Sequence, residues 1–287
     1  MKKLTAILRA PAGHWVGDGF PVRTIFSPQT LGTRISPFLM LDYAGPKEFT
    51  PSERPRGVEE HPHRGFETVT IIYQGGVEHR DSAGNQGRIG PGDVQWMTAA
   101  SGVVHEEMHD RDFTRRGGVF EVLQLWVNLP ARLKMSPPRY QELTAGQIPL
   151  VSLPDAAGSV RVIAGEFQGV RGPAQTFTPI NLWDIRLRAN GRVNLKLADG
   201  FTSAVFLLSG QARFNGDKSA GDAELALFEP AGEEISIEAA KDSTLLLLNG
   251  QPIDEPIASY GPFVMNTQDE IHQAIADYRA GRMGHLS

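Results

Sequence analysis

Short apolar runs, separated by turns rich in glycine and proline, cover most of the chain. Many of these runs favour Val, Ile and Thr, or place an aliphatic residue at every second position, as a half-buried β-strand does. Gly75-Gly76 and the segment Gly90-Pro91-Gly92-Asp93 permit sharp turns between neighbouring strands. Together the runs and turns predict an all-β fold. The clearest expected strands are Phe66–Tyr73, Val77–Arg80, Val94–Met97 and Glu121–Leu129.

The second half of the chain repeats the order of segments in the first half. We therefore expect two similar β-barrels, joined near residues 133–153, where strand signals are few. The first barrel is expected over residues 1–135 and the second over residues 136–287. The matching segments are Phe66–Gly75 with Phe201–Gly210, Gly92–Met97 with Ala223–Phe228, Ser101–His105 with Ala231–Ile235, and Leu123–Pro130 with Leu245–Pro252.

One helix is expected, over residues 267–281. Thr267 and Glu270 have the spacing of a capping box, and Gly281 stands where such a helix stops. A helix of roughly 13 residues is marginal alone in water, so its apolar face must be buried. That face can pack on the second barrel or cross back to the first, and we favour the crossing. It consists of Ile271, Ala274, Ile275 and Tyr278.

Composition narrows the class of protein without identifying a function. The 287 residues are 40% hydrophobic and 21% charged, as in a globular protein, and the net charge of −5 argues against direct contact with nucleic acid. No apolar run approaches the roughly 20 residues that span a membrane, and no signal peptide is evident. The chain has no cysteine, which excludes disulfides and fits a cytoplasmic location.

Two histidine motifs indicate a metal site. His61 and His63 have i, i+2 spacing, and so do His105 and Glu107, which places each pair on one face of a strand. Three imidazoles and one carboxylate suit a divalent transition metal and would leave positions open on a six-coordinate ion. The carboxylate is not fixed by spacing, because Glu67 shares the face of His63 if the strand is regular. Glu106 points the opposite way.

The other histidines are expected to lie outside the metal site. His109 has the parity of His105, which favours a place beside the site or at its mouth. His79 lies in a polar hairpin arm and is expected to be exposed, as are His14, His272 and His285. The motif itself does not recur, since the matching positions of the second barrel are Lys196, Ala198, Ile235 and Ile237. One metal per chain is therefore expected.

Longer segments around these residues resemble a known family. The spacings His61-x-His63-x-x-x-Glu67 and Gly102-x-x-His105 are similar to the metal motifs of the cupin superfamily. The full segments are similar to the signature of the pirin family, from near the N-terminus to the last helix. They are His61–Val69, Pro91–Ala99, Gly102–Met108 and Tyr260–Thr267.

The resemblance implies a bicupin, two jelly-roll barrels, with one mononuclear site in the N-terminal barrel. Carried onto this sequence, the family ligands are His61, His63, His105 and Glu107, and the metal is expected to be Fe²⁺. Glu67 then has a supporting role rather than a place on the metal. The second barrel is expected to carry no ligands.

The same resemblance implies quercetin 2,3-dioxygenase activity, with a flavonol and O₂ as substrates and Glu107 as the catalytic base that takes the flavonol proton. Two alternatives stay open: a dioxygenase acting on another enolisable molecule, and an iron-dependent regulator that works through a protein partner. A flat aromatic substrate needs an apolar pocket. Candidate wall residues are Phe66, Val69, Trp96 and Met97, of which about half are expected to face outward by strand alternation.

Overall fold

The chain forms two compact units, each built around a pair of β-sheets. The computed structural model describes residues 1–286. One unit, the N-terminal barrel, comprises residues 12–33, 38–145 and 253–286. The other, the C-terminal barrel, comprises residues 1–11, 34–37 and 146–252. Neither α-helix of the described chain has the length and apolar character needed to cross a membrane.

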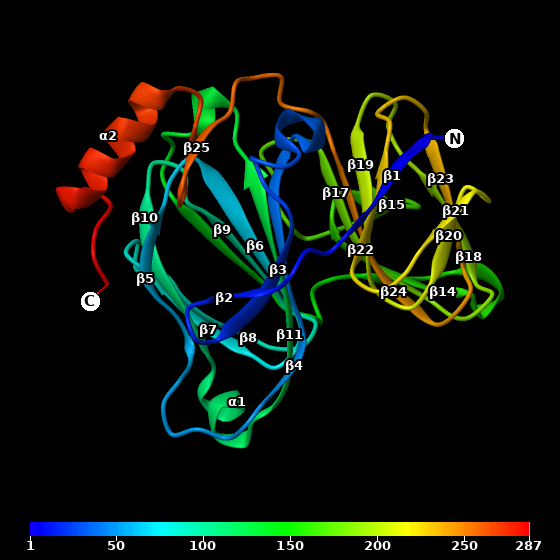
Figure 1. Ribbon diagram of the computed structural model, residues 1–287, viewed down its shortest axis with the longest axis horizontal. Helices are drawn as coiled ribbons and strands as arrows, with labels where there is room; N and C mark the ends of the chain where they lie inside the picture. Colours follow the sequence, from blue (N-terminus) through cyan, green and yellow to red (C-terminus); the bar gives the residue numbers. More distant parts are fainter. Residues whose placement is uncertain (287) are drawn as a thin grey trace. The chain divides into compact units, whose positions relative to one another are not determined.

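The N-terminal barrel pairs a seven-stranded antiparallel sheet, in the order β12-β9-β6-β11-β4-β3-β2, with a four-stranded sheet in the order β5-β10-β7-β8. A two-stranded ribbon and both α-helices complete it (Figure 1). The large sheet contains β2 His14–Val16, β3 Phe20–Phe26, β4 Phe38–Phe49, β6 Phe66–Gln74, β9 Val94–Thr98, β11 Gly118–Asn128 and β12 Arg139–Leu143. The remaining elements are β5 Gly57–His63, β7 Val77–Asp81, β8 Gln86–Ile89, β10 Val103–His109, α1 Arg111–Arg116, β25 Ala258–Tyr260, β26 Phe263–Met265 and α2 Gln268–Arg279.

The C-terminal barrel has the same plan. Its seven-stranded sheet has the order β1-β22-β19-β24-β17-β14-β13, and its four-stranded sheet the order β18-β23-β20-β21. The large sheet contains β1 Leu4–Arg9, β13 Leu150–Ser152, β14 Gly158–Ala164, β17 Ile180–Leu187, β19 Thr202–Ser209, β22 Glu224–Phe228 and β24 Ser243–Gly250. The remaining strands are β15 Glu166–Phe167, β16 Val170–Arg171, β18 Arg192–Lys196, β20 Ala212–Phe214, β21 Lys218–Ala220 and β23 Glu234–Ala239.

The internal repeat expected from the sequence is confirmed by this topology. β6, β9 and β11 occupy the same places in their sheet as β19, β22 and β24 occupy in theirs. The short antiparallel strands follow from the alternating pattern, and glycines at positive φ, such as Gly75 (φ 90°), make the tight turns. The all-β fold with two barrels and a terminal helix is therefore correct.

The two barrels do not divide the chain at residue 135 as expected, because each end of the chain belongs to the barrel formed mainly by the other half. β1, at the start of the chain, pairs with β22 and belongs to the C-terminal barrel. Residues 253–286 belong to the N-terminal barrel, where α2 contacts β25 and β26. Figure 1 shows α2 beside β25. The favoured crossing of the helix back to the first barrel is thus confirmed. Pairing between distant segments decides both ends, and local sequence patterns do not report it.

The C-terminal helix has the cap that the sequence predicts. The Thr267 hydroxyl accepts a hydrogen bond from the backbone N–H of Glu270, whose carboxylate accepts one from the N–H of Thr267. Ile271 and Ala274 are buried in a cluster that also contains Val104, Phe263 and Met265 of the barrel. Tyr278, which was expected to be buried with them, is 39% exposed.

The helix α1 and the strand β12 were not expected. The short helix α1 begins after Asp110, whose carboxylate accepts hydrogen bonds from the N–H groups of Asp112 and Phe113. It was missed because six residues are too few to show a helical period. Strand β12 lies in the stretch expected to be a linker, where it pairs with β9 at the edge of the sheet.

Candidate metal centre

Three histidines meet on the inner face of the four-stranded sheet. β5 and β10 are antiparallel neighbours, with His61 directly opposite His105 and His63 opposite Val103. The ring centroids of His61 and His105 are 4.2 Å apart, and the ring of His63 is 4.9 Å from each. One ring nitrogen from each histidine lies within 4.8 Å of the others. The i, i+2 spacing of His61 and His63, with the pairing of β5 and β10, thus brings the three predicted imidazoles together in a group that can hold a metal ion.

Two of the histidines use their outer ring nitrogen to donate a hydrogen bond. Nδ1 of His61 lies 2.8 Å from the carbonyl oxygen of Glu59, and Nδ1 of His63 lies 3.3 Å from that of Pro262. A carbonyl oxygen only accepts, so in both rings the proton is on Nδ1 and the Nε2 lone pair is free. Free Nε2 lone pairs are what a metal ion requires.

The third histidine, His105, has a buried ring nitrogen that shows whether the site suits a metal. Nε2 of His105 is fully buried and has no hydrogen-bond partner among residues 1–286. A buried polar atom without a partner costs free energy, so such atoms are rare unless they have a function. A metal ion held by three imidazoles would satisfy this nitrogen. The residues present therefore fit a divalent transition metal of borderline softness.

The local electrostatics keep the rings of His63 and His105 neutral. Burial lowers the pKa of His63 well below its ordinary value, and the neighbouring His61 lowers it further. Burial likewise lowers the pKa of His105, with further depression from His61, His63 and His79. Neutral imidazole is the form that binds metals, so the site favours binding over protonation near neutral pH.

The carboxylate of Glu107 reaches across the barrel interior to the large sheet. It accepts hydrogen bonds from Thr70 (3.1 Å), Gln95 (3.3 Å) and Gln124 (2.8 Å), on β6, β9 and β11. Glu107 and His61 line one cavity of about 40 Å³. The other lining residues are apolar except for two: Val16, Phe20, Val22, Asp42, Ala44, Val58, Val122 and Gln124.

Glu67, the alternative carboxylate, lies elsewhere. The strand is not regular from His63, because β5 ends there and Gly65 turns the chain with φ 92° before β6 begins. Glu67 is buried and accepts a 2.7 Å hydrogen bond from the Thr98 hydroxyl. By strand alternation it faces away from Thr70, which contacts Glu107. Burial raises the pKa of Glu67 to about 7.

A fourth histidine lies against the group, and the expectation that His79 is exposed was wrong. Its side chain is buried on β7, directly opposite Glu107 in the sheet. Its Nδ1 is 3.3 Å from Nδ1 of His105, and its Nε2 is 3.3 Å from Asp81. The sequence carried a signal for it, since His79-x-Asp81 has the same spacing as the two metal motifs.

The remaining histidines and Glu106 lie outside the group. His109 does not reach the site, which corrects its expected place: its Nε2 donates to the carbonyl of Gly19, and its ring packs against Phe49 and Phe120. His109 and His105 face the same side of β10, but they are four positions apart along the strand, which keeps the His109 ring away from the site. His14, His272 and His285 are exposed, as expected. Glu106 points outward, as expected, and pairs with Arg80.

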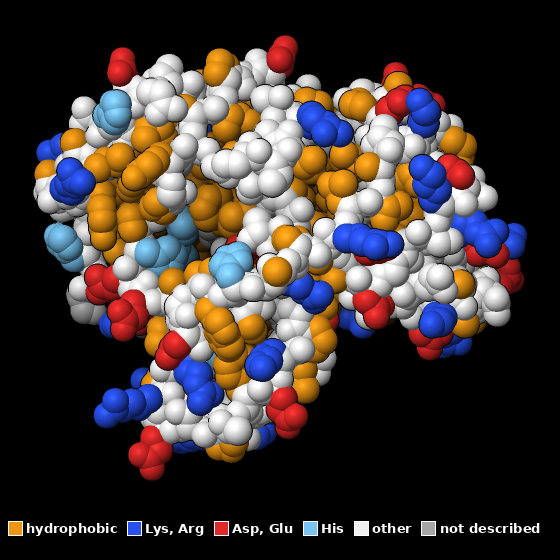
Figure 2. Space-filling view, in the orientation of Figure 1, with side chains coloured by type: hydrophobic (Ala, Val, Ile, Leu, Met, Phe, Trp, Pro, Cys, Tyr) orange, Lys and Arg blue, Asp and Glu red, His pale blue; other side chains and the backbone are white. Residues whose placement is uncertain are grey.

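Strand alternation separates the candidate wall residues into two pairs. The ring of Phe66 lies 5.1 Å from that of His63 and 4.2 Å from that of Trp126. Met97 shares the parity of Gln95 and so faces the interior. Val69 and Trp96 are paired on the opposite face of the sheet. Figure 2 shows histidine side chains in a hollow of the surface bordered by hydrophobic side chains.

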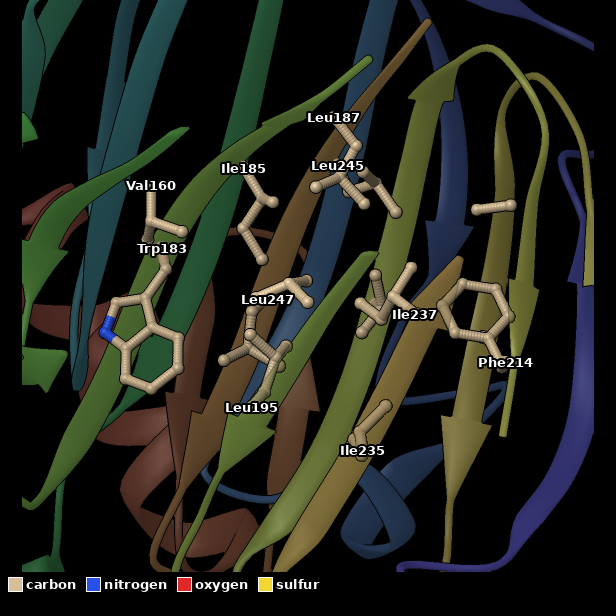
Figure 3. Close-up of a cluster of buried hydrophobic side chains, with 14 of the residues drawn as sticks. Val160, Trp183, Ile185, Leu187, Leu195, Phe214, Ile235, Ile237, Leu245 and Leu247 are labelled. Carbon is tan, nitrogen blue, oxygen red and sulfur yellow. The ribbon is translucent and has the colours of Figure 1, made fainter. Parts of the chain in front are cut away.

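In the C-terminal barrel Ile235 lies opposite Leu195, as His105 lies opposite His61, so Leu195 takes the place of His61 and the expected match with Lys196 was wrong by one residue. Lys196 and Ala198 are exposed. Ile235 and Ile237 on β23 are fully buried, and Figure 3 shows them among Leu195, Phe214 and other hydrophobic residues. The side chains of Leu195, Ile235 and Ile237 have no nitrogen or oxygen atom to hold an ion. The missing ligands were expected from the sequence, and the buried isoleucines explain how this barrel is stable without them.

Comparison with protein families matches both halves of the chain. A model of the family described as Pirin matches residues 19–127, and one described as Pirin C-terminal cupin domain matches residues 182–284. The chain belongs to the pirin family. Its two barrels are therefore cupins, and the fold is a bicupin, as the resemblance implied.

Related proteins match over nearly their whole length. A Pseudomonas aeruginosa protein named "Putative quercetin 2,3-dioxygenase" is 55% identical over 282 residues, covering 98% of each chain. Human pirin is 38% identical over 255 residues, covering 87% of this chain and 83% of its own. The crystal structure of a quercetin 2,3-dioxygenase from Acinetobacter baumannii has 47% identity and a TM-score of 0.98, with both chains fully covered.

Proposed function

We propose that this pirin binds one Fe²⁺ ion per chain through His61, His63, His105 and Glu107. The orphan Nε2 of His105 and the two Nδ1-protonated rings beside it support the histidine ligands. Glu107 is proposed as the fourth ligand because it lines the same cavity as His61, whereas Glu67 is on the other face of its strand. Three nitrogen ligands and one oxygen ligand suit iron, although sites of this kind select weakly among divalent metals.

We further propose that the protein is a quercetin 2,3-dioxygenase that cleaves a flavonol with O₂. The match to the Acinetobacter baumannii enzyme over the full chain supports this reaction class. When bound, the metal would supply Lewis acidity and open positions for oxygen ligands.

The residues of the chain would handle the substrate's proton and exclude water. Glu107 is the proposed base for the flavonol 3-hydroxyl, and its hydrogen bonds from Gln95 and Gln124 hold the carboxylate in place. Apolar residues on five strands line the cavity, among them Phe20, Val22 and Val122. Since the cavity holds about 40 Å³, it admits one small molecule, and the flavonol rings would lie outside it.

The proposal is tested by assaying quercetin loss and carbon monoxide release with the iron-loaded protein. The wild type should consume quercetin and O₂ and release carbon monoxide, and His63→Ala should do neither. Glu107→Gln should abolish turnover, while Glu106→Gln, the neighbouring carboxylate that pairs with Arg80 on the outer face, should leave it unchanged. An iron-loaded wild type that releases no carbon monoxide from quercetin would refute the proposed reaction.

A further inference from the structure

His105 differs from the other two histidines in the partner of its outer nitrogen. Nδ1 of His61 and of His63 faces a carbonyl oxygen, which forces the proton onto that nitrogen. Nδ1 of His105 instead faces Nδ1 of His79 at 3.3 Å. Either nitrogen of such a pair can donate, so this contact alone leaves the tautomer of His105 open. If His105 carried its proton on Nε2, it could not bind a metal through that atom.

Asp81 contacts the other nitrogen of His79, and this contact fixes the direction of the hydrogen bond between His79 and His105. One oxygen of the Asp81 carboxylate accepts 2.9 Å hydrogen bonds from the backbone N–H groups of Ala83 and Asn85, and the other accepts one from the Asn85 side chain. A carboxylate held by donors accepts from Nε2 of His79 as well, at 3.3 Å. The proton of His79 is therefore on Nε2, and its Nδ1 carries a lone pair.

Gln95 gives the same answer independently. Its side-chain oxygen faces the Tyr140 hydroxyl at 3.2 Å, and the orientation of the amide is fixed by the Glu107 carboxylate, which only accepts and therefore faces the amide nitrogen. That nitrogen lies 3.4 Å from Nδ1 of His79 and 3.3 Å from the carboxylate of Glu107. An amide nitrogen only donates, which requires Nδ1 of His79 to accept. Tyr140 also stacks on the His79 ring, with centroids 5.1 Å apart and 17° between the planes.

We propose that His79 is a positioning residue, which with Asp81 forms a carboxylate–imidazole chain that holds His105 with its proton on Nδ1 and its Nε2 lone pair toward the metal. The ring nitrogen of a ligating histidine that does not bind the metal commonly donates a hydrogen bond to a carboxylate or carbonyl oxygen. Here the imidazole of His79 lies between His105 and the Asp81 carboxylate. The register of the sheet builds the chain, because β10 places His105 opposite Asp81 and Glu107 opposite His79. The inference rests on the metal site of the proposed function, but not on quercetin as substrate.

Histidine tautomers are read directly by long-range ¹H–¹⁵N NMR of the full chain labelled at histidine. In the Zn²⁺-loaded protein, His105 should be protonated on Nδ1, and the ¹⁵N chemical shift of its Nε2 should change on metal binding. His79 should be protonated on Nε2, with no ¹⁵N chemical-shift change from metal coordination. If Zn²⁺ does not bind, the same two tautomers are expected in the metal-free protein. A proton on Nε2 of His105, a proton on Nδ1 of His79, or a ¹⁵N chemical-shift change from metal coordination at His79 would overturn the assignment.

Two variants of His79 separate positioning from packing. His79→Asn keeps an acceptor oxygen near the place of Nδ1, whereas His79→Leu removes it and keeps the bulk. We expect His79→Leu to weaken Zn²⁺ binding by about 10–100-fold, with His79→Asn restoring most of the loss. Equal affinity in the wild type and His79→Leu would overturn the proposal, and the tautomers of the wild type decide it if His79→Leu does not fold. If the protein binds Zn²⁺ as expected but the iron-loaded protein does not consume quercetin, the proposed reaction is refuted and the proposed role of His79 stands.

Discussion

Replacing Asp277 with alanine should destabilise the N-terminal barrel severely. Asp277 on α2 pairs with Arg64, the residue after the proposed ligand His63, at 2.7 Å, and their side chains are 12% and 5% exposed. At that distance the attraction between unit charges is about 6 kcal/mol at an effective dielectric constant of 20. Burial opposes ionisation of Asp277, but hydrogen bonds from Arg64 and Arg282 lower its pKa to about 2. Removing the carboxylate would leave the Arg64 guanidinium buried without its charge partner, which typically costs about 3–5 kcal/mol.

Arg282 provides the matched control. It binds the same carboxylate at 2.8 Å but is 56% exposed, so Arg282→Ala should cost less than about 1 kcal/mol. Urea unfolding followed by tryptophan fluorescence measures both free energies, in a Trp183→Phe background that confines the signal to the N-terminal barrel. The double variant Arg64→Met/Asp277→Leu should recover much of the loss. If Asp277→Ala costs no more than Arg282→Ala, the buried pair does not hold the helix in place.

Three further predictions concern the carboxylates and the helix cap. Glu107→Gln should weaken metal binding measured by dialysis and elemental analysis, whereas Glu67→Gln should leave the metal bound; the reverse result would exchange their roles. Because burial raises the pKa of Glu67 to about 7, against about 4.3 in an unfolded chain, its contribution to stability is lost as pH rises between these values. In Glu67→Gln the free energy of unfolding should fall less between these pH values than in the wild type. The same pH dependence in both proteins would contradict the burial argument. Thr267→Ala removes the cap of α2 and should lower the free energy of unfolding by about 1 kcal/mol, and a change below about 0.3 kcal/mol would count against the cap.

The features that follow from local spacing could be predicted from the sequence. Alternation and turn residues located β6, β7, β9 and β11, and i, i+2 spacing placed His61 and His63 on one face of their strand. Thr267 and Glu270 located the start of α2. In each case neighbours in the sequence are neighbours in the structure.

Features that depend on distant partners could not be read in this way. His79 looked exposed because its strand is rich in polar residues, but in the structure those on its inner face supply hydrogen bonds to the site. Gln124 alternates with Leu123 and Leu125 on a strand expected to be half-buried, and its side chain donates to Glu107 in the barrel interior. The barrel interior beside the site is polar, which reverses the usual meaning of the alternating pattern.

Anomalous diffraction from crystals of the protein loaded with Fe²⁺ tests the central claim most directly. The account predicts one strong anomalous peak per chain, within bonding distance of His61, His63, His105 and Glu107, and none in the C-terminal barrel, where Ile235 and Ile237 replace the ligands. A peak in the C-terminal barrel, or one bound by Glu67 instead of Glu107, would contradict it.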